Sequence, residues 1–174
     1  DLCTLMCPVS LYDTVTIDFS GTETDVTCTH SEIPDGSGNI AFKAVAFFHR
    51  LMSEKEACVS GVPSCPEDAK NPIGVKIKIE KNIPHCAGLG GGSSNAASVL
   101  LCMNRHYGYP IEHDVLVRKS AEIGADVPFF VFGKPAIATG IGENLTRFSF
   151  QTGLSVLIVS PAIEISTGEV FKNI

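Results

Sequence analysis

The sequence predicts a two-layer α/β fold of the α+β type, in which helices cover one face of a mixed sheet. Residues 9–20 and 74–84 alternate apolar and polar side chains, a pattern that is typical of half-buried strands. Residues 39–51 and 94–107 repeat their apolar side chains at helical spacing instead. With 44% hydrophobic and 18% charged residues, the 174-residue chain can bury a full core. We therefore expect one domain, alone or with a piece of a second one.

The first half of the chain carries two expected strands and one expected helix. After the strand over 9–20, the helix is expected to begin at Asn39, because asparagine is a preferred N-cap residue. Residues 53–73 lose this periodicity, and we interpret them as a loop. The strand from residue 74 onward is the clearest element, because three residues share one of its faces, namely Val75, Ile77 and Ile79.

The second half alternates expected helices with glycine-marked breaks. A helix is expected over 94–107, and a second one over 112–123 that stops at Gly124. Residues 125–143 favour a loop, a strand, a turn and a strand. The short apolar run "SVLIVSP" over 155–161 predicts a buried strand.

Charge and cysteine content exclude several classes of protein. The net charge of −6 argues against a general binder of nucleic acid or of membrane surfaces. Seven cysteines are an odd number and form no CxxC pair, which favours free thiols in a reducing compartment over disulfides or a zinc site. No metal-binding cluster is predicted, and no apolar run is long enough to span a membrane.

The stretch "HCAGLGGGSSNAASV" (85–99) concentrates four glycines and three serines between an expected strand and an expected helix. Free N–H groups and the dipole at a helix N-terminus attract anions, and nucleotide phosphates are frequent ligands there. A Walker loop is excluded because no lysine lies between Lys81 and Arg105. The dinucleotide fingerprint also fails, because the sixth position from Gly88 is Ser93. Phosphate binding is therefore favoured, and a tight turn between strand and helix is the alternative.

Four segments in order carry a family resemblance: "LMCPVSLYDTVTI", "PHCAGLGGGSSNAA", "GADVPFFVFGKPAIATGIGE" and "ISTGEVFKNI". They resemble the galactokinase, homoserine kinase, mevalonate kinase and phosphomevalonate kinase superfamily. Within it, they look like the family of 4-diphosphocytidyl-2-C-methyl-D-erythritol kinases. The resemblance implies an ATP-binding N-terminal domain over 1–150, of the ribosomal S5 domain 2-like fold with its first strands missing. Residues 151–174 would then begin a ferredoxin-like C-terminal domain.

The implied reaction transfers a phosphoryl group from ATP, with Mg²⁺, to the 2-hydroxyl of 4-diphosphocytidyl-2-C-methyl-D-erythritol in the non-mevalonate isoprenoid route. Phosphoryl transfer depends mainly on positioning and charge neutralisation, which a cradle of backbone amides can supply. By resemblance, the ATP-binding residues are Gly88, Leu89, Gly90, Gly91, Gly92, Ser93, Ser94 and, beside the adenine, Lys81. A solvated strand-end lysine is the alternative interpretation of Lys81. The resemblance places the enzyme in bacterial cytoplasm or in a plastid (stroma or apicoplast).

Three further residues take roles from the resemblance. Asp126, in "GADVPFF", is the expected catalytic carboxylate, which accepts or orients the proton of the substrate hydroxyl. It would lie between a helix end and an apolar strand, and a turn cap is its alternative role. Phe171 is expected to stack on cytosine, with a core position as the alternative, and Thr167 is expected to bind the substrate nearby.

The sequence also departs from the family pattern. Family members begin with a segment such as Ala-Lys-Ile-Asn-Leu followed by Asp-Gly-Tyr-His, which carries a catalytic lysine and has no counterpart in this sequence. We therefore expect the 174-residue chain to be inactive by itself. Another small-molecule kinase of the superfamily, such as a mevalonate or homoserine kinase, stays open as an alternative function. A non-catalytic nucleotide-binding fragment stays open as well, and the sequence predicts no oligomeric state.

Overall fold

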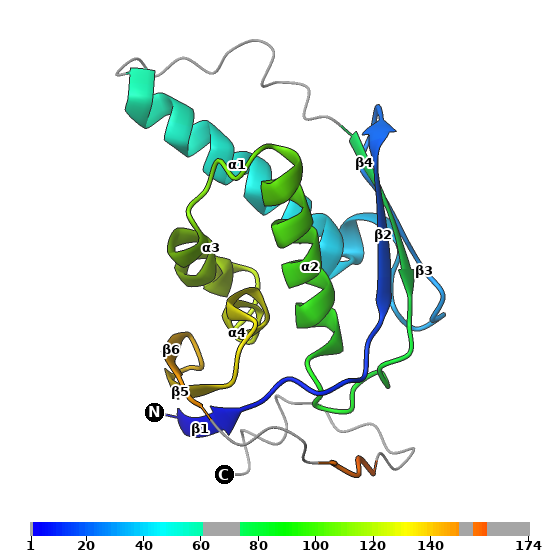
Figure 1. The fold of residues 1–174 in the computed structure, drawn as a ribbon. Coiled ribbons are helices and arrows are strands. Elements are labelled where there is room, and N and C mark those ends of the chain that lie inside the picture. Colours follow the sequence, from blue (N-terminus) through cyan, green and yellow to red (C-terminus); the bar gives the residue numbers. More distant parts are fainter. Residues whose placement is uncertain (1, 61–73, 150–154, 160–174) are drawn as a thin grey trace.

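The computed structural model describes residues 2–60, 74–149 and 155–159, and they form an α+β fold. Its main sheet has the order β2-β4-β3, with β2 over Thr14–Gly21, β4 over Gly74–Glu80 and β3 over Asp25–Cys28. Figure 1 shows this sheet as one layer and the long helices α1 and α2 beside it as the next. The predicted two-layer arrangement is confirmed.

The main sheet is mixed, as predicted. Strand β2 runs antiparallel to β4 and pairs Ile17 with Ile77, whereas β3 runs parallel to β4 and pairs Val26 with the same residue. The side chains of β4 alternate between buried and exposed, and the predicted inward face of Val75, Ile77 and Ile79 is buried. The strand expected from residue 9 begins only at Thr14. One face of the sheet therefore packs on the helices and the other carries polar side chains.

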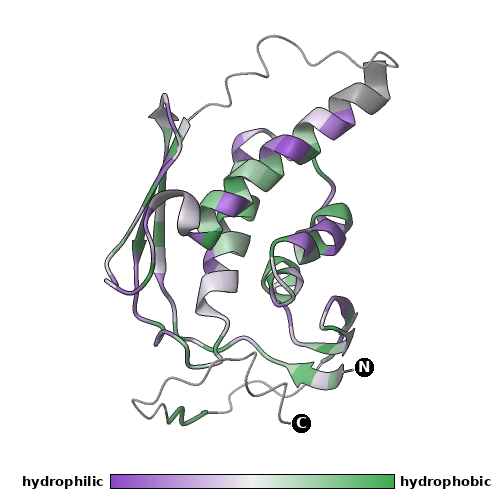
Figure 2. Ribbon diagram, turned by 180° about the vertical axis from the view of Figure 1, so that it is seen from behind, coloured by the Kyte–Doolittle hydropathy of each residue, from purple (hydrophilic) through white to green (hydrophobic). Residues whose placement is uncertain are grey.

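Helices α1 (Ile40–Ser60) and α2 (Gly91–His106) cover the inner face of the sheet and pack against each other. Asn39 caps α1 as predicted, because its side-chain Oδ1 accepts a hydrogen bond from the N–H of Ala41 at 2.9 Å. Both helices bury hydrophobic side chains, among them Phe48 and Leu100, and Figure 2 shows hydrophobic segments, in green, in each of them. The loop predicted over 53–73 is wrong for residues 53–60, which continue α1. Apolar periodicity is weak there, but nothing breaks the helix before residue 60.

Three short helical segments follow α2 in the chain, and α4 among them packs against it. They are α3 over His113–Lys119, a 3₁₀ turn over Ser120–Glu122, and α4 over Val127–Phe132. The predicted strand in the segment after Asp126 is wrong, because these residues form α4. Pro128 stands in the first turn of that helix, where its missing N–H costs nothing, and Gly133 closes it in the left-handed conformation. An apolar run of this length can fill a core as either a strand or a helix, and periodicity does not distinguish the two.

A second, antiparallel sheet has the order β1-β5-β6, with β1 over Leu2–Met6, β5 over Ala136–Gly140 and β6 over Asn144–Arg147. The sequence predicted β5 but neither β1 nor β6. The buried strand predicted over 155–161 is wrong for its described part. Residues 155–159 are exposed and pair with no described strand, so they lack the partner that a strand requires. No helix among the described residues is long and apolar enough to cross a membrane.

Candidate phosphate site at the start of helix α2

The glycine-rich segment forms a loop that leads from β4 directly into α2. Gly88 and Gly90 both adopt the left-handed conformation, with φ of 69° and 65°, which glycine reaches without steric cost. The helix begins at Gly91, three residues before the predicted start at Ser94. Gly91, Gly92 and Ser93 are therefore not part of a loop. They form the first turn of a helix of 16 residues.

The first turn of α2 presents backbone amides that have no acceptor. The first amide to form a helical hydrogen bond is that of Ser94, which donates to the carbonyl oxygen of Gly90 at 2.8 Å. Within the described residues, the N–H groups of Gly91, Gly92 and Ser93 donate to no oxygen. Neither a side-chain cap nor an acidic residue occupies this helix end. The three amides and the helix dipole thus leave an uncompensated positive end, which suits an anion.

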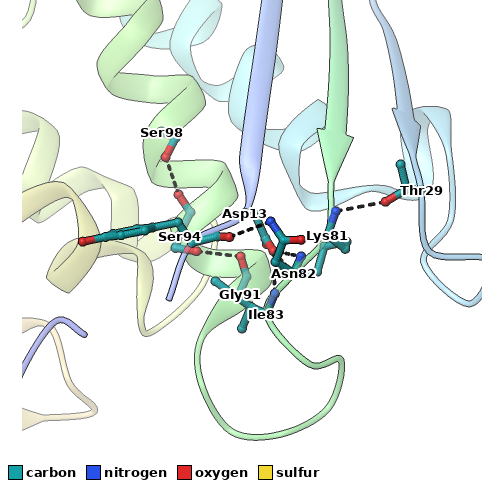
Figure 3. A network of polar contacts seen from close by, with 9 residues as sticks. Asp13, Thr29, Lys81, Asn82, Ile83, Gly91, Ser94 and Ser98 are labelled. Atoms are coloured by element: carbon teal, nitrogen blue, oxygen red, sulfur yellow. Dashed lines mark hydrogen bonds and ion pairs between the residues drawn. The ribbon is translucent and has the colours of Figure 1, made fainter. Parts of the chain in front are cut away.

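The two serines of this turn differ in what their hydroxyl groups do. The hydroxyl of Ser94 donates to the carbonyl oxygen of Gly91 at 2.8 Å, so it is occupied within its own helix (Figure 3). Ser93 is half-buried, and its hydroxyl has no hydrogen-bond partner in the described part of the chain. Of the two, Ser93 is therefore the one that can donate to a ligand.

The glycines of this segment are needed for different reasons. A Cβ atom at Gly90 would lie 2.6 Å from the ring of Phe130 on α4, and one at Gly91 would lie 2.8 Å from the Nζ of Lys81. A Cβ atom at Gly92, by contrast, would come no closer than 3.6 Å to its nearest neighbour, a methyl group of Ile40. The fold itself therefore requires glycine at 90 and 91 but leaves room for alanine at 92.

Lys81 is not the solvated strand-end lysine of the alternative interpretation. Its side chain is only 4% exposed, and its Nζ pairs with Oδ2 of Asp13 at 2.5 Å, whose side chain is 1% exposed. Figure 3 shows this pair at the base of the loop, beside Gly91. The buried ammonium lies beside the first residue of α2, and its charge is already paired with the Asp13 carboxylate. A direct contact between Lys81 and adenine stays a prediction.

Sequence reasoning missed Asp13, although a signal for it exists. Asp13 precedes Val15 and Ile17 by two and four residues, so it continues the inward-facing row of β2. A charge on an inward row must find a partner, because an unpaired buried charge is too costly. Burial raises the pKa of Asp13, but the hydrogen bonds from Lys81, Ile83 and Asn82 outweigh it and hold the pKa below its usual value.

Asp126 occupies the N-cap position of α4 and is exposed. A place between a helix end and an apolar strand was expected, and the strand is wrong because Val127–Phe132 form helix α4. Its side chain makes no capping hydrogen bond, so the alternative role of a turn cap finds no support in these contacts. The turn that carries it adjoins the first turn of α2, because a Cβ atom at Gly124 would lie 4.0 Å from the Oγ of Ser93. The predicted carboxylate and the start of α2 thus belong to neighbouring segments.

The remaining predicted site residues, Thr167 and Phe171, lie outside the described residues. Across the described ranges, no three His, Cys, Asp or Glu side chains gather as metal ligands would. The described cysteines are all free thiols: Cys3, Cys7, Cys28, Cys86 and Cys102.

Comparison with known proteins agrees with this architecture. The family model described as GHMP kinases N terminal domain matches residues 39–134, which include α1, β4, the glycine loop, α2 and Asp126. This chain belongs to that family.

Individual relatives of the chain are named as one kind of kinase. A 4-diphosphocytidyl-2-C-methyl-D-erythritol kinase of Geobacter metallireducens is 41% identical over 175 residues, covering 100% of this chain and 56% of the relative. One of Pelobacter propionicus has the same identity and the same coverage. A crystal structure of 4-(cytidine 5'-diphospho)-2C-methyl-D-erythritol kinase superposes with a TM-score of 0.61 at 32% identity, covering 89% of this chain and 52% of that one. The chain therefore spans about half the length of the relatives that it matches.

Proposed function

We propose that this chain forms the ATP-binding part of a kinase that phosphorylates 4-diphosphocytidyl-2-C-methyl-D-erythritol at its 2-hydroxyl. The observation that carries the proposal is the open first turn of α2, in which three amides and the Ser93 hydroxyl have no described partner. The substrate is taken from the names of the two bacterial relatives and of the superposed structure.

In this proposal, ATP binds as its magnesium complex and α2 receives its phosphates. The amides of Gly91, Gly92 and Ser93 neutralise phosphate charge that grows during transfer, and they need no reorganisation because the helix already fixes them. The left-handed Gly88 and Gly90 bring the preceding backbone around the phosphates, with Leu89 between them. The proposed cradle thus uses the backbone more than side chains.

Asp126 is the proposed catalytic carboxylate. Its exposed side chain has no cap to serve, and its turn adjoins Ser93, so a substrate hydroxyl bound there would lie between the carboxylate and the phosphates. In the reaction, the hydroxyl oxygen bonds to the γ-phosphorus while the bond from that phosphorus to the β-phosphate bridging oxygen breaks. The hydroxyl proton passes to Asp126, and ADP leaves.

The acceptor side of the proposal rests on Phe171 and Thr167. Stacking of cytosine on an aromatic ring is worth about 1–3 kcal/mol, so Phe171→Ala should raise the KM for the cytidyl substrate about 5- to 150-fold and leave that for ATP unchanged. Equal losses for both substrates would assign Phe171 to the core instead.

The domain boundary and the cellular setting belong to the same proposal. Residues 1–150 would form the nucleotide-binding domain, and residues 151–174 would begin the domain that completes the acceptor site. The free thiols of the described cysteines are compatible with a reducing compartment, either bacterial cytoplasm or a plastid.

A coupled ADP-release assay tests the activity. The full-length product of the gene is given MgATP with the cytidyl substrate, with mevalonate or with homoserine in parallel. We expect turnover with the cytidyl substrate only. Turnover with mevalonate or homoserine would support the alternative of another superfamily kinase, and nucleotide binding without turnover on any acceptor would support a binding module.

Gly92→Ala tests the phosphate cradle with little disturbance of the fold. The Cβ atom has room, and alanine restricts the unfolded chain more than glycine does, so the substitution should not destabilise the fold. If phosphates approach this backbone closely, the variant should fold normally but bind ATP about tenfold or more weakly, which is about 1.4 kcal/mol. Gly108→Ala is not a suitable control because its φ is 76°. Ser98→Ala is better, since Ser98 is exposed and lies further along the same helix.

A further inference from the structure

The buried Asp13 gathers groups from both ends of the glycine loop. Its Oδ1 accepts the backbone N–H groups of Asn82 and Ile83, each at 2.8 Å, and both residues lie where the chain leaves β4 for the loop. Its Oδ2 accepts the ammonium of Lys81. Figure 3 shows these donors converging on the one carboxylate. The entry to the loop is therefore fixed by a residue outside it, 68 positions earlier than Lys81 in the sequence.

The exit of the loop is tied to the same carboxylate. Asn95, which is buried in the second turn of α2, is among the groups that lower the pKa of Asp13. The Nζ of Lys81 lies so close to Gly91 that a Cβ atom there would come within 2.8 Å of it. Asp13 thus acts on the first turn of α2 through Lys81, whose ammonium it holds beside Gly91.

Two further hydrogen bonds hold the entry of the loop, but they contribute less than the Asp13 contacts. The side-chain amide of Asn82 donates to the carbonyl oxygen of Tyr12 at 3.0 Å, and the backbone N–H of Lys81 donates to the hydroxyl of Thr29 at 2.9 Å. Both are exposed, so water can replace either of them. Water cannot replace the Asp13 contacts in the same way, because both side chains of the ion pair are almost fully buried.

We propose that Asp13 is a positioning residue for the nucleotide, which clamps the two ends of the glycine loop so that the first amides of α2 keep the orientation that the phosphates need. The inference rests on the proposed function for its ligand, ATP, but not for the clamp itself. Asp13 touches neither ATP nor the acceptor in this account. It acts through Lys81 and the amides of Asn82 and Ile83.

Asp13→Asn is the principal test in the full-length protein. It keeps an acceptor oxygen for the two amides but removes the charge and leaves the buried ammonium unpaired, which is more damaging than losing the whole pair. We expect the Kd and KM for ATP to rise about tenfold or more, with kcat at saturating ATP changed less than about threefold. Hydrogen exchange of the amides of residues 82–95 should accelerate by a similar factor, with or without nucleotide.

Two further variants test whether removing the unpaired ammonium restores the loop. They are Lys81→Met and the double variant Asp13→Asn with Lys81→Met. Lys81→Met leaves a carboxylate that still accepts the amides of Asn82 and Ile83, so we expect a smaller effect than for Asp13→Asn. The double variant leaves no unpaired buried charge, and its exchange rates and Kd should be closer to wild type than those of Asp13→Asn. These variants also keep the test decisive if Asp13→Asn fails to fold.

Two controls separate positioning from a general loss of stability. Asp18→Asn removes an exposed carboxylate from β2, the strand that follows Asp13. The Oδ1 of Asp18 accepts a hydrogen bond from the N–H of Ser20, and the substitution should change nothing at the loop. Leu116→Ala removes a fully buried side chain of α3 and should destabilise the fold while leaving the Kd for ATP unchanged.

The outcomes distinguish the clamp from the proposed function. A wild-type Kd together with unchanged exchange over 82–95 in Asp13→Asn would overturn the clamp. An equal rise of Kd in Leu116→Ala would overturn it as well, because stability alone would then explain the loss. If the wild-type protein bound no ATP, the proposed function would fail, and the exchange measurements would still decide whether Asp13 orders the loop.

Discussion

The two ends of helix α2 differ in which polar groups lack a hydrogen-bond partner and in how exposed those groups are. At the N-terminal end, the unpaired groups are backbone amides of Gly91, Gly92 and Ser93, which are partly or fully exposed, and the buried charges beside them are paired. At the C-terminal end, the unpaired groups are buried side-chain atoms. The Nε2 of His49, on the neighbouring α1, and the hydroxyl of Tyr107 have no hydrogen-bond partner among the described residues.

Aromatic rings, not a polar network, surround the C-terminal end. The ring of Tyr107 stacks on that of Phe48 with 5.7 Å between centroids, and His49 meets it edge-on at 6.4 Å. Next to them, Phe19 of β2 stacks on His106 at 3.7 Å. Burial lowers the pKa of His49 and raises that of Tyr107, so both groups are held in their neutral forms.

The difference shows which unpaired groups can serve a ligand. An unpaired amide that water reaches costs little in the empty protein and gains a partner when an anion binds. An unpaired atom inside an aromatic cluster costs stability at all times and is reached by no ligand. We therefore expect substitutions at the N-terminal end to change catalysis and binding, and substitutions at the C-terminal end to change stability and its pH dependence.

The largest effect is expected at Asp126. In the full-length protein, Asp126→Asn should lower kcat about 100-fold or more, because a positioned acid–base group contributes on that scale, and should leave ATP binding nearly intact. Steady-state kinetics and a nucleotide titration measure the two quantities. Asp114→Asn, at the exposed start of α3, is the matched control and should have full activity. Normal turnover by Asp126→Asn would reduce that residue to a structural role.

The next largest effect is a difference in ATP affinity between variants of the two serines in the first turn of α2. Ser93→Ala should weaken ATP binding about tenfold, since hydrogen bonds to charged groups contribute about 1.5–3 kcal/mol. Ser94→Ala should weaken it much less, because the Ser94 hydroxyl already donates to Gly91. Isothermal titration with MgATP compares them. A larger loss for Ser94→Ala would mean that its hydroxyl leaves the helix to bind the ligand.

At the other end of α2, His49 should make stability depend on pH. Because burial lowers its pKa in the folded protein, the unfolded chain takes up a proton first as the pH falls below the ordinary value of 6.5. The free energy of unfolding should therefore fall between pH 7.5 and 5.5, by at most about 1.4 kcal/mol per pH unit from this one site. Urea denaturation of His49→Phe should show a shallower slope, whereas His113→Gln, at an exposed imidazole, should retain the wild-type slope. An unchanged slope in His49→Phe would show that His49 does not cause the pH dependence of stability.

The smallest effect is expected at Tyr107. Tyr107→Phe removes a buried hydroxyl that has no partner and keeps the ring that packs on Phe48. The free energy of unfolding should stay unchanged or rise by up to about 1 kcal/mol, and ATP binding should not change. A loss of more than that amount would show that the hydroxyl has a partner in solution, such as a bound water molecule.

The sequence predicts the parts of this fold that follow one local rule. The alternation of Val75, Ile77 and Ile79 marks β4, and Asn39 marks the start of α1, because each pattern depends only on neighbouring residues. The helical state of 127–132 and the pairing of β1 with β5 depend on tertiary packing, which no short segment encodes. The site divides in the same way. The glycine loop stands out in the sequence, whereas the pairing of Asp13 with Lys81 joins residues that only the folded sheet brings together.

The central claim is that the first turn of α2 receives the phosphates of ATP, and amide chemical shifts test it most directly. A titration of the ¹⁵N-labelled full-length protein with a magnesium complex of a non-hydrolysable ATP analogue should shift the amides of Gly91, Gly92 and Ser93 most strongly. Met103 and Tyr107, at the opposite end of the same helix, should shift little. Saturable binding that leaves the three amides in place, or that shifts the C-terminal end instead, would contradict the account.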